Sequence, residues 1–187
     1  FFKNNLNTNK ILCFEPNKPY VKVLKNLKLN DLLIYDYGIS QNNKKFKVYY
    51  PRYKFFGRNL DLITYTFYNK KDLMKQINTD FKFKKGISIV QKYINLKKVK
   101  KIKYKISLVK IDVNGHEHSV VKGLGNTIKK DRPVLIVETD KNIKKIEFFL
   151  KKLNYKKYSF SKNKKKFEII KNRYPLNTYF LQNYHIN

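Results

Sequence analysis

Residues 107–140, SLVKIDVNGHEHSVVKGLGNTIKKDRPVLIVETD, decide the fold of this chain. The run at 108–113 is short and mostly apolar and β-branched, which is typical of a strand buried on both faces. The pair Asn114-Gly115 ends this run, because Asn-Gly favours a turn. A second continuous apolar run at 134–137 predicts another buried strand.

The segment between these two strands has the periodicity of a helix. From Glu117 onward, apolar residues recur on one helical face. Asp131-Arg132-Pro133 ends this helix, because proline lacks an N–H group and clashes with the preceding turn. A strand, a crossover helix and a strand form a βαβ unit, which is expected to be right-handed. The apolar face consists of Val120, Val121, Leu124 and Ile128.

The rest of the chain alternates in the same way. The order of predicted strands and helices indicates an α/β fold of the Rossmann-like kind, with a mostly parallel sheet and an antiparallel last strand. Residues 1–187 are expected to form a single domain. The predicted strands are 10–14, 32–37, 86–91, 155–160 and 177–182, and 166–171 is a further candidate. The predicted helices begin at Asn17 and after Asp140, and residues 1–9 are expected to be a helix end and a polar turn.

The middle of the chain gives weaker signals. Residues 46–50 predict an edge strand or hairpin arm that Pro51 ends. Residues 52–85 interleave aromatic and basic side chains, with a short helix expected at 72–77. Residues 92–106 are expected to be a basic link leading into the central unit.

Composition limits the class of protein. The hydrophobic fraction is 42%, which is typical of a globular chain. No apolar run approaches the ~18 residues that a membrane span needs, so no membrane partner is expected. The single cysteine, Cys13, cannot form an internal disulfide, which favours a reducing, cytoplasmic setting.

The formal charge of +30 raises a nucleic-acid hypothesis. The lysines are spread along the whole chain, however, and the favoured residues Lys, Asn, Ile, Phe and Tyr have A/T-rich codons. A low-GC genome alone explains such a composition. Nucleic acid is therefore not the expected partner, although the aromatic and basic stretch 49–68 could stack bases.

Two places carry acidic residues at the ends of predicted strands. Glu15 ends a strand and precedes a helix, where doubly wound folds use a carboxylate to bind both ribose hydroxyls of a nucleotide. The Gly-rich loop that normally precedes it is not found, because the first glycine is Gly38. The alternative is that Glu15 is an ordinary surface carboxylate before a turn.

The second place is the carboxyl end of the strand at 108–113, where open α/β sheets bind ligands. Asp112 is a candidate ligand for a cationic group or an acid/base group, or else a cap of the turn. His116 and Glu117 follow it, but His116-Glu117-x-x-Val120 is not the zinc motif H-E-x-x-H, so no metal is predicted. Glu138 either lines the same crevice or is solvated.

Several of these strings together resemble a known family. Residues 109–117 (VKIDVNGHE), Gly123 and residues 132–138 (RPVLIVE) resemble the FkbM-type family of S-adenosylmethionine-dependent methyltransferases. Residues 14–17 (FEPN) look like the second-strand segment of that family, with Leu24, Asn26 and residues 29–30. Residues 38–40 match its third-strand exit, and residues 177–180 (NTYF) its closing strand.

The resemblance implies a class I methyltransferase fold and S-adenosylmethionine as cofactor. It implies that Glu15 holds the ribose, that Gly38, Ile39 and Ser40 lie near the adenine, and that Asp112 lies near the methionine or methyl end. His116 and Glu117 would lie on the acceptor side, so the candidate catalytic residues are Asp112, His116 and Glu117. Family members usually methylate a hydroxyl, often on sugars, glycans or polyketide-like molecules.

The chain also departs from the family pattern. Asn114 stands where the family commonly has Glu, and the first strand with its Asp-x-Gly-x-x-x-Gly loop is not found. Because the chain begins at Phe1, an N-terminally truncated fragment is expected, which alone would bind the cofactor weakly and be inactive. Two alternatives remain, namely a basic nucleic-acid-binding protein and a non-catalytic remnant of the same fold. The oligomeric state stays open.

Overall fold

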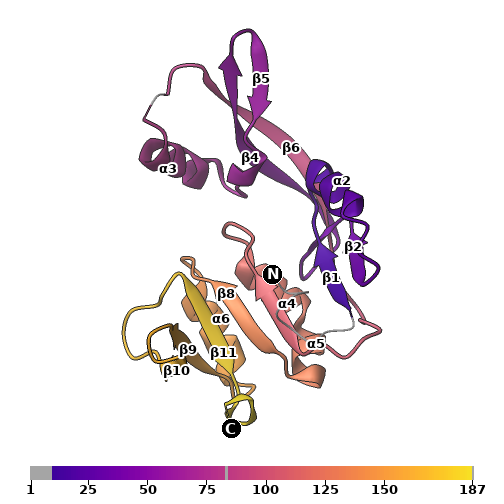
Figure 1. The fold of residues 1–187 in the computed structure, drawn as a ribbon, viewed down its shortest axis with the longest axis vertical. Helices are drawn as coiled ribbons and strands as arrows, with labels where there is room; N and C mark the ends of the chain where they lie inside the picture. Colours follow the sequence, from indigo (N-terminus) through magenta and orange to yellow (C-terminus); the bar gives the residue numbers. More distant parts are fainter. Residues whose placement is uncertain (1–9, 83, 187) are drawn as a thin grey trace.

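The computed structural model describes residues 10–82 and 84–186, so the helix end predicted at 1–9 lies outside the described residues. The chain is a mixed α/β fold, as predicted, and its described strands form three sheets (Figure 1). The strands are β1 (Ile11–Phe14), β2 (Leu32–Tyr35), β3 (Gly38–Ile39), β4 (Lys44–Phe55), β5 (Arg58–Asp61), β6 (Ile87–Lys97), β7 (Leu108–Ile111), β8 (Val134–Glu138), β9 (Lys156–Ser161), β10 (Lys166–Ile169) and β11 (Asn177–Leu181). The helices are α2 (Lys18–Asn26), α3 (Lys70–Asp80), α4 (Glu117–Gly123), α5 (Gly125–Asp131) and α6 (Ile143–Lys151), with short 3-10 turns η1 (Ile63–Tyr65) and η2 (Asn183–His185).

The predicted βαβ unit is confirmed. β7 and β8 are parallel, with Val109 opposite Leu135, and α4 and α5 connect them. The expected single helix is divided at Leu124, which lies between Gly123 and Gly125, two residues of low helix propensity. Arg132 adopts a left-handed conformation (φ 51°) and ends α5 before Pro133, as the sequence indicates.

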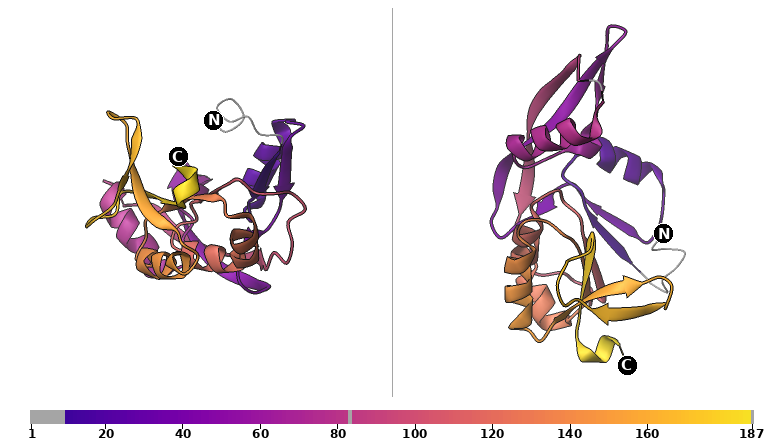
Figure 2. Two further views of the ribbon diagram at one scale, coloured as in Figure 1. Left: turned by 90° about the horizontal axis from the view of Figure 1, so that it is seen from below. Right: turned by 90° about the vertical axis from the view of Figure 1, so that its left-hand side faces the viewer.

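The five-stranded sheet has the order β10-β9-β11-β8-β7. β11 is antiparallel to both β8 and β9, and β9 is antiparallel to β10, so the antiparallel character predicted for the last strand is confirmed. Figure 2 shows α4, α5 and α6 along one side of this sheet. The core between them is fully buried and includes Val121, Ile128, Leu135, Val137, Ile146, Leu150 and Phe180.

The four-stranded sheet, β3-β6-β4-β5, corrects two predictions. Pro51 does not end its strand, because β4 continues to Phe55. The Pro51 carbonyl accepts a hydrogen bond from the Leu62 N–H, just beyond the end of β5. In an antiparallel ladder the nitrogen and the carbonyl of one residue face the same neighbouring strand, so the Pro51 nitrogen, which carries no hydrogen, also faces the β5 side. The ladder between β4 and β6 therefore loses no donor at Pro51. The second correction is β6, which runs to Lys97 through part of the expected basic link.

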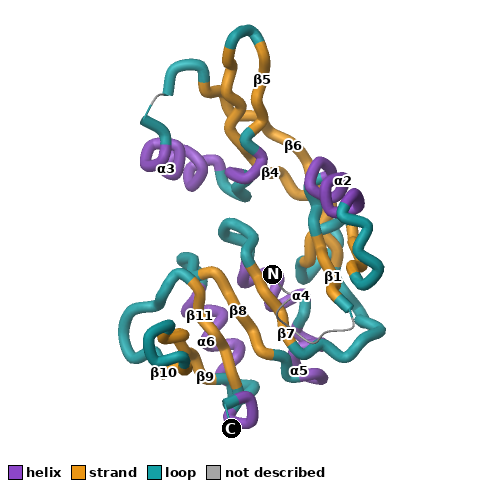
Figure 3. The backbone as a smooth tube through the Cα atoms, viewed as in Figure 1, coloured by secondary structure: helices purple, strands orange, loops and turns teal. Residues whose placement is uncertain are grey.

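The third sheet is the parallel pair β1-β2, with Ile11 opposite Leu32, and α2 connects the two strands. In the part of the chain that the structure describes, β1 pairs with β2 alone and β7 with β8 alone. The strands therefore do not form one continuous, mostly parallel sheet there. The backbone trace in Figure 3 shows the β1-β2 pair set apart from β7 and β8.

Candidate functional site

The carboxyl ends of β7 and β8 bring two acidic side chains together. Asp112 follows β7 and Glu138 ends β8, and because these strands are parallel, both residues lie at the same edge of the sheet. Burial, and then a hydrogen bond and the charge of Asp112, raise the pKa of Glu138 to about 7. A charged carboxylate next to Glu138 disfavours the ionised form of Glu138. Glu138 is half-buried beside Asp112 at this edge of the sheet, and its part in lining a crevice stays a prediction.

Two further polar groups complete this cluster. The Lys110 ammonium lies 3.1 Å from Asp112 Oδ2 and donates to Asn177 Oδ1 at 2.6 Å. Asn177 begins β11 opposite Glu138 in the antiparallel register. The Asp112 side chain is 53% exposed, so it combines a fixed cationic neighbour with access to a ligand.

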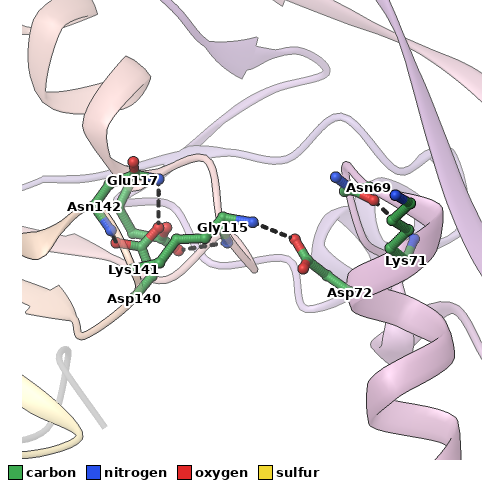
Figure 4. A network of polar contacts seen from close by, with 8 residues as sticks. All are labelled: Asn69, Lys71, Asp72, Gly115, Glu117, Asp140, Lys141 and Asn142. Carbon is green, nitrogen blue, oxygen red and sulfur yellow. Dashed lines mark hydrogen bonds and ion pairs between the residues drawn. The ribbon is translucent and has the colours of Figure 1, made fainter.

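Glu117 is the first residue of α4, and its side chain stabilises the turn that follows β7. Its side chain is fully buried, and Oε1 accepts hydrogen bonds from the N–H groups of Val113 and Gly115, each at 3.1 Å. Figure 4 shows Glu117 next to Gly115. That turn uses left-handed backbone at Asn114 (φ 53°) and Gly115 (φ 99°). Burial raises the pKa of Glu117 to about 7, and its Oε2 has no partner among the described residues. The contacts of Glu117 are those of a residue that positions the turn.

His116 directly precedes α4 and packs against two aromatic rings. Its ring is stacked on Tyr68 at a centroid distance of 4.3 Å, and Phe46 lies 5.5 Å away. Burial, and then the charge of Lys44, lower the pKa of His116 to about 4. The imidazole is therefore neutral at pH 7, and its buried Nε2 has no partner in the described part of the chain.

Glu15 follows β1, as predicted. It is half-buried, and its Oε1 accepts from the Asn17 N–H at 2.6 Å. Burial raises the pKa of Glu15, whereas the hydrogen bonds from Asn17 and the charge of Lys92 oppose that rise. Burial raises the pKa of Tyr68, and the charges of Glu117 and then Glu15 raise it further. The charges of Glu117 and Glu15 therefore both act on the Tyr68 hydroxyl.

The exit of β3 lies deep in a junction between elements. A Cβ added at Gly38 would lie 2.7 Å from Leu96 Cδ2, so a larger residue there would require the Leu96 side chain to shift. Ser40 is fully buried, its Oγ lies 3.0 Å from Ser119 Oγ, and its N–H donates to the Lys97 carbonyl. Ile39 is also buried. These three residues pack β3 against β6 and α4, and their contact with adenine stays a prediction.

One ion pair joins α3 to the loop before α6. The Lys141 ammonium lies 2.6 Å from Asp72 Oδ2, as Figure 4 shows. In the same loop, Asp140 Oδ1 accepts from the Asn142 N–H at 2.8 Å. This loop follows Glu138, so the pair connects the four-stranded sheet region to the edge that carries the acidic cluster.

The structure thus separates the predicted site residues into two settings. Asp112 is open and paired with Glu138, whereas His116 and Glu117 are enclosed and paired with rings and backbone amides. The sequence did not indicate Tyr68 or Lys92 as neighbours of the site. No local signal identifies either residue, because both are brought there by the four-stranded sheet.

The described residues contain neither a candidate metal site nor a membrane-spanning helix. Residues 10–82 and 84–186 contain no group of three or more His, Cys, Asp or Glu side chains that could hold a metal ion. In the same ranges, no helix has the length and the apolar character needed to cross a membrane.

The comparisons with known proteins place the chain in a family. The model of the methyltransferase FkbM domain matches residues 1–160, so the chain belongs to the FkbM methyltransferase family, and the resemblance seen in the sequence is confirmed. The crystal structure of Methyltransferase FkbM from Methylobacillus flagellatus KT has a similar fold, with a TM-score of 0.52 at 13% identity. The match covers 92% of this chain and 36% of that chain, so this chain spans about a third of the length of that protein. Among curated proteins, no sequence match was found.

Proposed function

We propose that this chain forms part of an S-adenosylmethionine-dependent methyltransferase that transfers the methyl group to a hydroxyl of a sugar, glycan or related metabolite. The observation that carries the proposal is the position of three acidic residues at strand ends, with Glu15 after β1, Asp112 after β7 and Glu138 at the end of β8. Family membership supports the methyl-transfer chemistry.

The acidic residues at these strand ends suit the cofactor. The carboxylate of Glu15 can accept hydrogen bonds from a ribose cis-diol, because a carboxylate accepts and does not donate. Asp112 supplies negative charge for the positively charged sulfur and amino group of the cofactor. S-adenosylmethionine, when bound, supplies an electrophilic methyl group.

The strand arrangement supports a class I methyltransferase sheet. The β1-β2 pair and the β7-β8-β11-β9-β10 series would become one sheet if a further strand paired with β1 on one side and β7 on the other. The antiparallel β11 between β8 and β9 corresponds to the antiparallel last strand of that fold. We propose that the two sheets are parts of one sheet of this kind.

Asp112 is the residue in this chain best placed to take the acceptor proton. Its side chain is 53% exposed at the strand ends, so an acceptor hydroxyl could reach its carboxylate, and Lys110 and Glu138 hold it in place from within the sheet. Glu117 contributes by holding the turn that follows Asp112. Neutral His116 contributes an aromatic wall with Tyr68.

The geometry of the aromatic residues does not favour the nucleic-acid alternative. Base stacking needs a row of accessible ring faces along a basic groove. Within residues 49–68, Tyr50 is buried and Tyr68 is stacked on His116. These two rings therefore support internal packing, and the exposed rings of Phe55 and Phe56 contact each other at one turn and do not form a row along a groove.

The test uses the whole polypeptide that carries this chain. Formation of S-adenosylhomocysteine is followed with a panel of mono- and oligosaccharide acceptors. We expect Asp112→Asn to lower kcat by about 100-fold, as for loss of a general base. Asp80→Asn is the matched control, since Asp80 is an exposed residue at the end of α3. Unchanged turnover in Asp112→Asn would remove Asp112 from the mechanism.

A further inference from the structure

The hairpin of β4 and β5 ends in an exposed apolar tip. The hairpin projects from the body of the molecule at the top of Figure 1. Phe56 is 89% exposed, Phe55 57% and Leu60 56%. The two phenyl rings contact each other edge to face, with centroids 4.4 Å apart. Large apolar groups gathered at a protruding tip indicate an interaction site more strongly than apolar residues scattered singly.

The backbone conformation of the tip is unfavourable for a phenylalanine at position 56. Phe55 pairs with Arg58, so Phe56 and Gly57 form a two-residue turn, and both have positive φ (45° and 73°). Such a turn favours Asn-Gly, because asparagine tolerates left-handed backbone better than a bulky residue does. Phenylalanine at position 56 is therefore unfavourable for the turn itself. Its presence points to a role for the exposed ring.

Cations surround the apolar tip. Lys54 and Arg58 flank the turn in the hairpin. The Lys54 N–H donates to the Gly86 carbonyl at 2.9 Å, which brings the neighbouring Lys84 and Lys85 to the same end of the sheet. Residues 53–60 and 84–88 contain no acidic residue. The acidic residue that follows, Asp61, is paired with Arg52 at 2.6 Å.

We propose that this tip docks on an anionic lipid bilayer. Phe55, Phe56 and Leu60 enter the interfacial region, and the surrounding lysines and Arg58 contact lipid phosphates. The proposal is independent of methyl transfer. No membrane partner is expected from the sequence, because no apolar run in it is long enough to span a bilayer, but docking by a hairpin tip does not need such a run.

A bilayer fits these observations better than a nucleic acid does. The tip is a projecting hairpin, whereas single strands bind in grooves that follow their backbone. Leu60 has no aromatic face on which a base could stack. The three apolar side chains carry no hydrogen-bonding group that would read a base or a polar protein surface. Apolar groups ringed by cations complement acyl chains beneath anionic headgroups.

The first test measures co-sedimentation of the full 187-residue chain with phosphatidylcholine vesicles that contain roughly 30% phosphatidylserine. We expect Phe56→Asn to weaken vesicle binding by about tenfold, because one large apolar side chain is removed from the interface. This variant installs the preferred Asn-Gly turn, so its hairpin is expected to remain folded. Phe148→Ser is the matched control, because Phe148 is 65% exposed on α6.

The second test follows insertion directly. The chain contains no tryptophan, so Phe56→Trp introduces a single fluorescent reporter at the tip. We expect its emission to shift to shorter wavelength with anionic vesicles, and that of Phe148→Trp to stay unchanged. No shift for Phe56→Trp, or equal vesicle binding by Phe56→Asn and the unmodified chain, would overturn the proposal. A shift produced by single-stranded RNA and not by vesicles would also overturn it.

Discussion

The five-stranded sheet and the four-stranded sheet are stabilised to different extents by their own side chains. The first packs α4, α5 and α6 over a continuous core that includes Leu135, Ile146 and Phe180. The second buries a cluster of Val48, Ile94 and Leu96, with Phe46 and Tyr68 packed against it. The first region is therefore a stable frame for the strand ends, and the second is a thinner layer that supplies aromatic walls and an exposed tip.

The largest expected effect is a loss of stability that differs between the cores of the two sheets. Leu135→Ala should lower the free energy of unfolding by about 4 kcal/mol, because a fully buried leucine in a continuous core leaves a cavity. Leu96→Ala should cost about 2 kcal/mol, because a smaller cluster can relax around the loss. Urea unfolding monitored by circular dichroism measures both values. Equal losses would show that the four-stranded sheet is as tightly packed as the frame.

The contact between the two regions is expected to be the next most sensitive place. A Cβ at Gly123 would lie 2.5 Å from the Ser40 carbonyl oxygen and 2.9 Å from Ile39 Cγ2. Gly123→Ala should therefore destabilise the protein by about 2–3 kcal/mol, because backbone must move to make room.

Gly125→Ala is the matched control for this junction. The added Cβ would have ordinary contact with Phe149 at 3.6 Å, and α5 gains a better helix former. We expect this variant to have unchanged or slightly higher stability. If Gly123→Ala also left the stability unchanged, the expectation that β3 packs closely on α4 would be wrong.

A pH effect is expected within the frame. The pKa of Glu117 is about 7 in the folded protein and 4.5 for the unperturbed group, so the folded state holds a proton that the unfolded state releases between these values. This contribution to stability is fully present below pH 4.5 and is lost as the pH rises through 7. Glu117→Gln removes the loss, so the variant should gain about 1–2 kcal/mol relative to the unmodified protein between pH 5 and 8.

Thermal unfolding of both proteins at a series of pH values checks this prediction. The difference in unfolding free energy between variant and unmodified protein should increase with pH over that range. A difference that is constant with pH would contradict the buried, proton-holding state of Glu117. Glu168→Gln serves as control, because the pKa of Glu168 is lowered by its hydrogen bond with Lys164.

The smallest expected effect concerns the ion pair that joins the regions. Asp72 and Lys141 are both substantially exposed, with side-chain exposures of 41% and 63%. Asp72→Asn should lower stability by less than about 0.5 kcal/mol, because solvent and salt screen such pairs. Chemical denaturation at low and high salt measures this value. A loss above 1 kcal/mol would show that the pair is a principal link between the regions.

The contrast between the regions also explains what the sequence could predict. The β7-α4-α5-β8 unit was predicted because its apolar runs, Asn-Gly turn and proline stop are local signals. β4 was predicted to end at Pro51, because proline normally interrupts a ladder, and only the position of β5 shows why it does not. In β6, the apolar residues Ile94 and Leu96 alternate with polar residues, and this alternation is a strand signal within the segment expected to be a basic link.

The site was predictable to the same extent as its strands. Glu15 and Asp112 were located from the strand ends that carry them, and the structure places them there. The stacking of His116 on Tyr68 and the burial of Glu117 depend on packing between distant segments, which no local pattern encodes. The functional roles of these residues remain predictions.

The most direct test of the central claim is a calorimetric titration of S-adenosylmethionine into the whole polypeptide that carries this chain. We expect Glu15→Gln to weaken binding by about 10–100-fold, because hydrogen bonds from the ribose hydroxyls to a charged carboxylate are lost. Glu168→Gln, on the edge strand β10, should bind as the unmodified protein does. Equal affinity for Glu15→Gln and the unmodified protein would contradict the proposal that the end of β1 holds the cofactor.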